Sequence, residues 1–459
     1  MANITFGSYS PPSIPPTPMQ AKCVVHFRPK NNWQGEDYGF DWMRMGETTN
    51  FGDTKYEDIV AKQYTDTTYT ILETNLNNYR GAFQKNATLY NNLKNIYSFY
   101  TIPWKLNANN TPEEYFVPWL SLYPSKLLNS RTRRMEDSGF HNTKALLSVI
   151  IDVTEEPDTI KFKENEHFTI TPMEITTKTV GTHTINDHVI IECIKEFSTD
   201  QTIEIIATKR DEQGVEIPKL AGKLRVWANN APKRKKANIL IIEVKTPPIS
   251  DPRQSKEGDS TGQKELFEKY LRQALIECNV VTRTLDLSAD TNFQTGGHYV
   301  KDGKLVGYYE GASYNPYREN THQPTGFIRL ENYVYNKLQE QLTGENETRT
   351  MYDTYFKAIY VGEGGGCVNP QDILEELNGY SNSTNVVLFP TKNDQTAAHE
   401  FLHSFTLPHS FANSEADNNA LFTYTYAKTE NLLDYSHNIP QTRYNLWKWQ
   451  WVKANAHIR

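Results

Sequence analysis

Residues 399–409 read HEFLHSFTLPH, a stretch that carries three histidines and one glutamate. On an α-helix, side chains four positions apart lie one above the other on the same face. His399 and His403 can therefore offer two imidazoles to a single metal ion. Glu400, one position further on, points partly away and is placed to act on a water held by that ion. The spacing predicts a helix that carries two metal ligands and a general base.

The third predicted ligand is His409, which lies six residues beyond His403 and cannot share its helix face. The helix must end and the chain must turn back toward the ion. Pro408 fits such an end because it disfavours a helical conformation at Leu407. Glu430, 27 residues beyond His403, is the alternative third ligand. A helix whose histidines are satisfied by backbone groups is the alternative to a metal site.

The stretch resembles the active-site motif of the metzincin clan of zinc metallopeptidases, HExxHxxGxxH, which is followed downstream by a turn with a methionine beneath the metal. Here ENLLDYSH (430–437) matches that turn. Leu433 stands in the methionine place, and Tyr435 matches a tyrosine found in some metzincin families. The residues that match the first motif are His399, Glu400, His403 and His409.

The resemblance implies one catalytic Zn²⁺ held by the three histidines, with Glu400 as the general base. It also implies a role for Tyr435, either as a zinc ligand at rest or as a group that stabilises the oxyanion. A tyrosine that simply packs within the turn is the alternative.

Two positions depart from the metzincin pattern. Thr406 occupies the glycine position, where a left-handed conformation costs a β-branched residue about 1–2 kcal/mol. A zinc site, with about 10 kcal/mol of apparent binding free energy, can offset that strain, or the turn can take another shape. Leu433 for methionine is nearly volume-conserving and typically costs less than about 1.5 kcal/mol. Because neither change removes a ligand or the base, we expect catalysis to be intact.

Strands and helices alternate along residues 237–459, which predicts a largely parallel sheet flanked by helices. We expect an α/β (mixed), metzincin-like zinc peptidase domain here. The glycines of GEGGGCVNP (362–370) do not make a nucleotide site and predict a flexible loop near the cleft. Cys367 in that loop is either an ordinary thiol or a zinc ligand of a latent form. The predicted strands are 237–246, 279–288, 355–363 and 385–391, and the predicted helices are 262–278 and 330–342.

Two further regions precede this domain. Short β-rich runs at regular spacing predict an immunoglobulin-like (Ig-like) β-sandwich at 145–230. Residues 1–144 form a Tyr/Trp-rich mixed region of unassigned role, with a proline-rich arm at 8–18. NNAPKRKK (229–236) is predicted to be an exposed, basic linker between the sandwich and the metal domain.

Composition limits the partners. The formal charge of −7 is spread along the chain without a basic domain, so nucleic acid is not an expected partner. No apolar run approaches the roughly 18 residues that cross a bilayer, and no Sec-type signal peptide is evident. We expect a protein or peptide substrate, and export by another route such as a contractile secretion machine.

The LPHSF and WKWQW segments are similar to metallopeptidase domains of bacterial toxins and effectors. In that interpretation the N-terminal half is the adaptor that contacts the secretion apparatus. Two alternatives have different chemistry: a structural or binding protein braced by zinc without catalysis, and an amide hydrolase that acts on cell-wall peptides.

Overall fold

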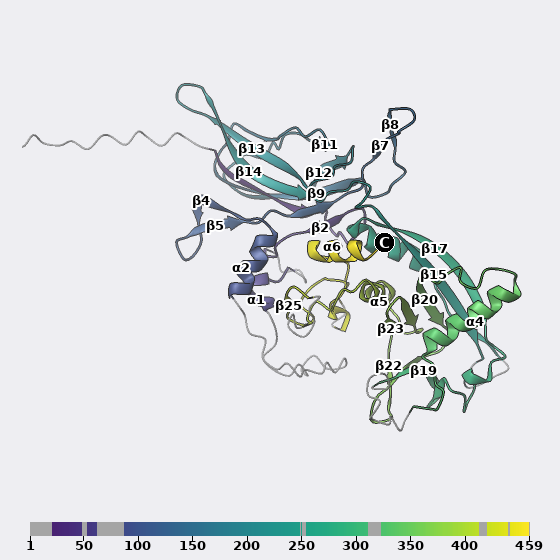
Figure 1. Cartoon of the computed structure of the whole chain (residues 1–459). Coiled ribbons are helices and arrows are strands. Elements are labelled where there is room, and N and C mark those ends of the chain that lie inside the picture. Colours follow the sequence, from purple (N-terminus) through teal and green to yellow (C-terminus); the bar gives the residue numbers. More distant parts are fainter. Residues whose placement is uncertain are drawn as a thin grey trace, which may run out of the picture.

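The computed structural model describes residues 21–47, 53–61, 87–247, 249, 254–310, 323–412, 420–438 and 441–458. The predicted proline-rich arm at 8–18 lies outside these residues. The described part has more strands than helices, and the strands form several β-sheets (Figure 1). This composition confirms a mixed α/β protein. No described helix is long and apolar enough to cross a membrane.

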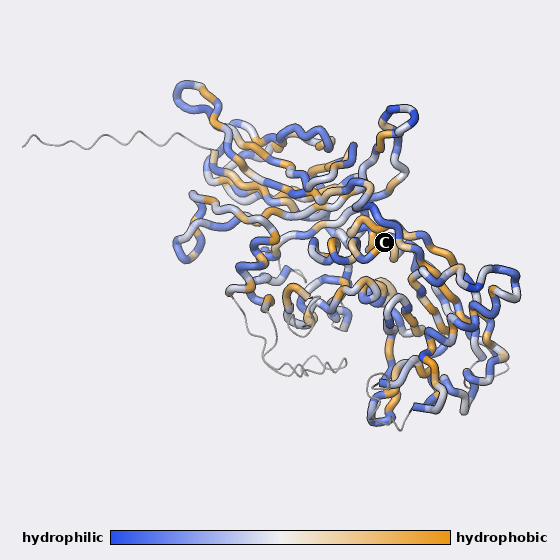
Figure 2. Tube along the Cα trace, viewed as in Figure 1, coloured by the Kyte–Doolittle hydropathy of each residue, from blue (hydrophilic) through white to orange (hydrophobic). Residues whose placement is uncertain are grey.

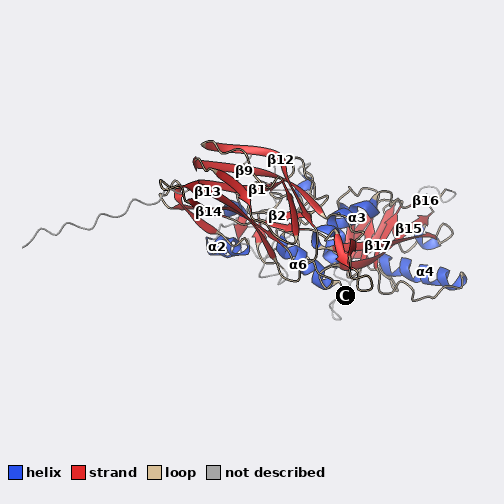
Figure 3. Ribbon diagram, turned by 90° about the horizontal axis from the view of Figure 1, so that it is seen from above, coloured by secondary structure: helices blue, strands red, loops and turns tan. Residues whose placement is uncertain are grey.

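Two sheets, antiparallel except where β6 lies parallel to β14, build a β-sandwich (Figure 3). Their strand orders are β1-β9-β12-β11 and β10-β13-β14-β6-β2. Alternate residues of strands from both sheets, such as Val149 and Ile205, fill one shared hydrophobic core. The strands are β1 (Lys22–Pro29), β2 (Gly39–Asp41), β6 (Trp119–Ser121), β9 (Lys144–Glu155), β10 (Thr159–Phe162), β11 (Phe168–Thr171), β12 (Gly181–Cys193), β13 (Gln201–Arg210) and β14 (Glu216–Val226).

The sandwich draws on residues before 145, the predicted start of the β-rich region. Strand β1 pairs with β9 along its whole length, from Lys22 opposite Glu155 to Pro29 opposite Leu147. Strands β2 and β6 extend the other sheet beyond β14. Non-local pairing of this kind leaves no signal in the local sequence, so spacing alone could not join these strands to the sandwich.

A third sheet, largely parallel, forms the scaffold of the C-terminal half. Strand β15 lies parallel to both β17 and β20, β24 lies parallel to β20, and β23 is the antiparallel edge. The elements are β15 (Lys235–Thr246), β16 (Lys256–Glu257), β17 (Ile276–Asp286), β20 (Phe356–Val361), β23 (Gly379–Asn382), β24 (Asn385–Leu388), α3 (Gln263–Leu271), α4 (Leu330–Gly344), α5 (Thr396–Ser404) and α6 (Lys448–His457).

The two faces of this sheet bury different helices. Ile239 and Ile241 of β15 share a core with α3, α5 and α6, whereas Leu240 and Ile242 share a core with α4. This alternation follows from the two-residue period of a strand. Figure 2 shows hydrophobic stretches along the strands of both halves, while projecting loops are hydrophilic.

The predicted helix 262–278 is shorter than its apolar spacing indicates. Helix α3 ends at Leu271, a 3₁₀ turn follows, and Leu275 takes a left-handed conformation with φ 55°. Strand β17 then begins at Ile276 and pairs with β15 over eleven residues. Sheet pairing outweighs the helical periodicity at the end of this segment.

The predicted linker 229–236 is packed in part. Asn229 is fully buried, its side chain donating to the Leu122 carbonyl at 2.9 Å and accepting from the Phe197 amide at 3.0 Å. Arg234 pairs with Glu196 at 2.6 Å. The expectation of an exposed connection holds for Ala231, Pro232 and Lys236 but not for Asn229 and Arg234, because these two side chains find partners in the sandwich.

The predicted flexible loop at 362–370 is also wrong, because it contains strand β21, which pairs with β19 and β22. A Cβ at Gly366 would lie 1.7 Å from the Glu375 carbonyl oxygen, so its glycine allows a close backbone approach. This sheet comprises β18 (Val300–Lys301), β19 (Lys304–Tyr309), β21 (Gly365–Val368) and β22 (Leu374–Glu376).

Part of the N-terminal region packs into the C-terminal half. Strand β3 pairs with β25, the indole of Trp447 donates to the Tyr56 hydroxyl at 2.8 Å, and Asp41 accepts from the Lys448 amide at 2.8 Å. The remaining elements are α1 (Tyr56–Ile59), β3 (Val60–Ala61), α2 (Ala87–Ile96), β4 (Tyr100–Leu106), β5 (Pro112–Tyr115), β7 (Lys126–Leu128), β8 (Met135–Asp137) and β25 (Thr423–Tyr424).

Candidate metal centre

Helix α5 carries His399, Glu400 and His403 and follows strand β24 after a short polar loop. Ala397 and Ala398 are buried, and their small side chains let the helix pack closely against the sheet core. The helix therefore holds two histidines at a fixed spacing on a rigid support.

The helix ends through a left-handed residue, Thr406, with φ 63°. The Leu407 amide donates to the Leu402 carbonyl at 3.1 Å, and the Thr406 amide donates to the His403 carbonyl at 2.9 Å. This is the geometry that usually favours glycine, and Thr406 adopts it with an exposed side chain. The structure therefore has the strained left-handed conformation at Thr406 and not a turn of another shape. The turn brings His409 back to the helix.

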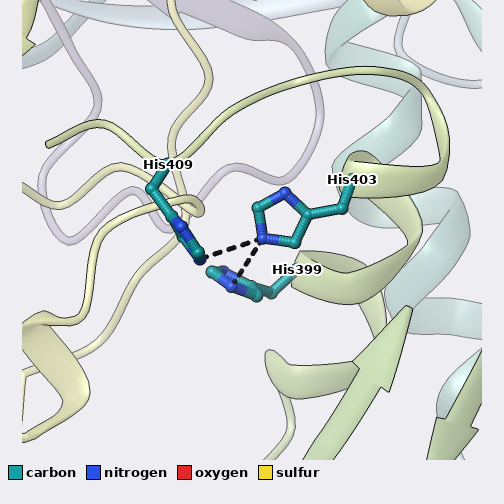
Figure 4. A group of neighbouring side chains, drawn as sticks. All are labelled: His399, His403 and His409. Carbon is teal, nitrogen blue, oxygen red and sulfur yellow. Dashed lines mark hydrogen bonds between the residues drawn. The ribbon is translucent and has the colours of Figure 1, made fainter. Parts of the chain in front are cut away.

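The three histidines converge, as the spacing indicates (Figure 4). The Nε2 atom of His403 lies 3.2 Å from that of His399 and 3.0 Å from that of His409. Two nitrogens that each lie about 2.0–2.1 Å from a tetrahedral zinc ion are about 3.3 Å apart. The group has the size that one metal ion requires, so the residues present could hold such an ion.

Hydrogen bonds to backbone carbonyls fix the tautomers of two of these rings. The Nδ1 atom of His399 lies 2.7 Å from the Leu432 oxygen, and that of His403 lies 2.8 Å from the Leu407 oxygen. A carbonyl oxygen only accepts, so both Nδ1 atoms carry a proton, which in a neutral ring leaves Nε2 unprotonated. The Nε2 atoms of His399 and His403 then face each other as lone pairs, which repel unless a cation lies between them.

Burial holds the rings of His399 and His409 in their neutral form. Burial lowers the pKa of His399 and of His409 well below 6.5, and the neighbouring His403 and the charge of Arg443 lower both further. His399 is only 3% exposed, so water does not offset the loss of solvation. Neutral imidazole is the form that binds metal.

The segment 430–437, which resembles a methionine turn in sequence, contacts the site through the Leu432 carbonyl. Leu433 is fully buried and its carbonyl accepts from the Ser410 amide at 3.0 Å, close to His409 in the chain. The carboxylate of Asp434 accepts from the Ala427 and Thr429 amides, each at 2.9 Å. The leucine fills the position with an apolar side chain and no polar group.

Tyr435 lies beside the histidines. Its ring centroid is 4.8 Å from that of His409 and 5.6 Å from that of His399. It also packs against Phe411 at 5.1 Å. This position is compatible with a tyrosine that only packs within the turn and with one whose hydroxyl acts at the site.

Sequence patterns missed Arg443, which lies 44 residues from the helix ligand it contacts. Its Nη1 atom lies 3.1 Å from Nδ1 of His399 and donates to the Asp434 carbonyl at 2.9 Å. Burial lowers the pKa of this guanidinium to about 10. Tyr435, Asp434 and the half-buried Glu400 act in the opposite direction and raise it. A buried arginine beneath a histidine cluster has no spacing rule that could reveal it.

The two other ligand candidates lie in different places. Glu430 is buried and forms an ion pair with Arg44, and the three-histidine group does not include it. Cys367 groups instead with Glu310 and Glu375, its sulfur 3.7 Å from a Glu310 oxygen. His409 is therefore the third ligand that the geometry offers.

Neither a protein-family model nor a curated protein matches this chain.

Proposed function

We propose that the chain is a zinc-dependent metallopeptidase with a metzincin-like active site. The observation that carries the proposal is the convergence of the histidine Nε2 atoms at 3.0 and 3.2 Å with two of the Nδ1 protons directed at carbonyls. Three neutral imidazoles are a ligand set of catalytic zinc sites and leave a position open for water.

The residues have separate roles in the proposed reaction. His399, His403 and His409 hold the ion. When bound, zinc lowers the pKa of a coordinated water toward neutrality and polarises the substrate carbonyl. Glu400 takes the proton from the attacking water and delivers it to the leaving amine. The Tyr435 hydroxyl stabilises the developing oxyanion by donating a hydrogen bond.

The proposed substrate is a protein or peptide. We also propose that the protein is exported without a Sec signal, with the N-terminal half as the adaptor to a contractile secretion machine. The contacts of Asp41, Tyr56 and strand β3 with the C-terminal half support a single transported body. Detecting the protein outside cells only when the apparatus is present would support this route, and retention regardless of the apparatus would contradict it.

The test of catalysis compares the wild type with Glu400→Gln, both loaded with zinc. Each is incubated with casein, a peptide library and peptidoglycan fragments, with a chelator control, and metal content is measured in parallel. We expect the wild type to cleave peptides and Glu400→Gln to lose at least about 10²-fold in rate while it retains zinc. Cleavage of peptidoglycan alone would identify a cell-wall amide hydrolase, and no cleavage by the zinc-loaded wild type would indicate a structural zinc site.

A further inference from the structure

A cluster of cations and tryptophans lies where helix α6 meets the sandwich (Figure 1). Lys448 is the first residue of the helix, and its Nζ atom lies 4.6 Å from the ring centroid of Trp119 and 4.8 Å from that of Trp227. Trp119 begins strand β6, and Trp227 directly follows strand β14. A lysine of the C-terminal half therefore contacts two aromatic side chains that the sandwich supplies.

The ammonium of Lys448 is nearly buried. The residue is 8% exposed, and its Nζ atom has no hydrogen-bond acceptor and no ion pair among the described residues. Asp41 lies nearby, but its oxygens accept from the Lys448 backbone amide at 2.8 Å and from the Tyr97 hydroxyl at 3.0 Å. The Nζ atom keeps some contact with solvent, unlike the indole nitrogens of Trp449 and Trp451, which are sealed from water. A small ion can therefore reach the ammonium.

Two further cations share the faces of the same tryptophans. The guanidinium carbon of Arg225 lies 4.2 Å from the ring centroid of Trp119, and the Nζ atom of Lys233 lies 5.8 Å from that of Trp227. The Arg225 side chain is 32% exposed and Lys233 is half-buried, so both border solvent. The carboxylate of Asp200 lies 3.9 Å from Arg225 and offsets one of the three positive charges.

The local electrostatics favour an anion at this position. Burial lowers the pKa of Lys448 to about 8; Asp200 and Asp41 act to raise it, and Lys233 and Arg225 lower it further. The three cations outnumber the two carboxylates, so the cluster is positive and attracts negative charge. The N-terminus of α6, where Lys448 stands, also favours an anion through the helix dipole. Cation–π contacts offset only part of the solvation that the ammonium loses, and a bound anion would supply the missing acceptors.

We propose that this cluster of Lys448, Arg225 and Lys233 binds a doubly charged oxyanion. The ligand is either inorganic phosphate or the phosphate group of a small phosphomonoester, and the Lys448 ammonium donates to one of its oxygens. Both sources share the chemistry that the cluster recognises. The inference goes beyond the peptidase function and does not depend on it, because it uses neither the three histidines nor Glu400.

The test titrates the full-length, zinc-loaded protein with inorganic phosphate and with phenyl phosphate, and uses acetate as the singly charged control. Isothermal titration calorimetry at constant ionic strength measures the affinities. We expect at least one of the two phosphates to bind at least about tenfold more tightly than acetate. Tighter binding of phenyl phosphate points to a phosphomonoester, and equal or tighter binding of inorganic phosphate points to the free ion.

Three variants locate the binding. Lys448→Met keeps the length of the side chain and removes its charge, and we expect at least about tenfold weaker binding of phosphate. Lys453→Met is the matched control, because it removes a lysine of the same helix that lies 5.9 Å from the ring centroid of Trp449, and it should keep the wild-type affinity. Lys233→Glu, at the half-buried rim, should also weaken binding at least about tenfold, and it decides the result if Lys448→Met does not fold.

Equal affinities for acetate and both phosphates would overturn the proposal. Wild-type phosphate affinity in Lys233→Glu, or in a folded Lys448→Met protein, would overturn it as well, because the anion would then bind elsewhere, for example at the zinc ion.

Discussion

The guanidinium of Arg443 and the imidazole of His399 converge on one backbone carbonyl, that of Leu432, at 3.4 and 2.7 Å. The Arg443 Nη1 and His399 Nδ1 atoms are 3.1 Å apart. Through this carbonyl, the turn that carries Leu433 sets the orientation of a candidate ligand ring. Outer hydrogen bonds of this kind typically change metal affinity about 10–100-fold.

Arg443→Met should therefore weaken zinc binding about 10–100-fold, because the carbonyls of Leu432 and Asp434 lose a shared donor. Competition with a chromophoric chelator measures the affinity. Arg134→Met, at an exposed position of the β7–β8 hairpin, is the control and should keep the wild-type value. Identical zinc affinity in the wild type and Arg443→Met would show that Arg443 does not support the site.

Replacing Thr406 by glycine should relieve the strain of its left-handed conformation, at φ 63°. The gain of about 1–2 kcal/mol exceeds the entropy that glycine adds to the unfolded chain, about 0.4–1 kcal/mol. We expect the free energy of unfolding to rise by about 0.5–1 kcal/mol in urea, with zinc content unchanged. Thr406→Val keeps the branched side chain and should show no such rise. A less stable Thr406→Gly protein would mean that the threonine side chain contributes more than its strain removes.

Arg44→Met should destabilise the protein by about 3–5 kcal/mol, because it leaves the buried carboxylate of Glu430 without its cation. Urea unfolding at pH 7.5 measures the change. Arg210→Met breaks an exposed pair with Glu216 and should change stability by less than about 1 kcal/mol. A small effect of Arg44→Met on the free energy of unfolding would show that the ion pair with Glu430 does not stabilise the folded protein.

Acidification should destabilise the metal-free protein. The pKa of His399 lies well below 6.5 in the folded chain, chiefly through burial, so below pH 6.5 the unfolded chain binds a proton that the folded chain does not. The free energy of unfolding then decreases as the pH falls from about 6.5. Each buried histidine with a lowered pKa contributes up to about 1.4 kcal/mol per pH unit. Urea unfolding of chelator-treated protein at pH 7.5, 6.5 and 5.5 measures the slope.

The matched variants for this pH dependence are His399→Gln, which should reduce the slope, and the exposed His141→Gln, which should not. A wild-type stability that stays constant between pH 7.5 and 5.5 would contradict the neutral, buried state of the ring.

Local spacing was enough to find the histidines, because helix periodicity and a proline stop are written into 399–409. The same reasoning located β15, β20 and α4. It could not find Arg443, Arg44 or the pairing of β1 with β9, because each depends on residues far apart in the chain. It also predicted a flexible loop at 362–370, where Gly365 and Gly366 allow strands to approach closely.

The most direct test of the metal site is zinc stoichiometry combined with zinc K-edge X-ray absorption on the loaded, desalted protein. We predict one zinc per chain with three imidazole nitrogens at about 2.0–2.1 Å and no sulfur. Failure to retain zinc, or a ligand set that contains sulfur or fewer than three imidazoles, would contradict the account.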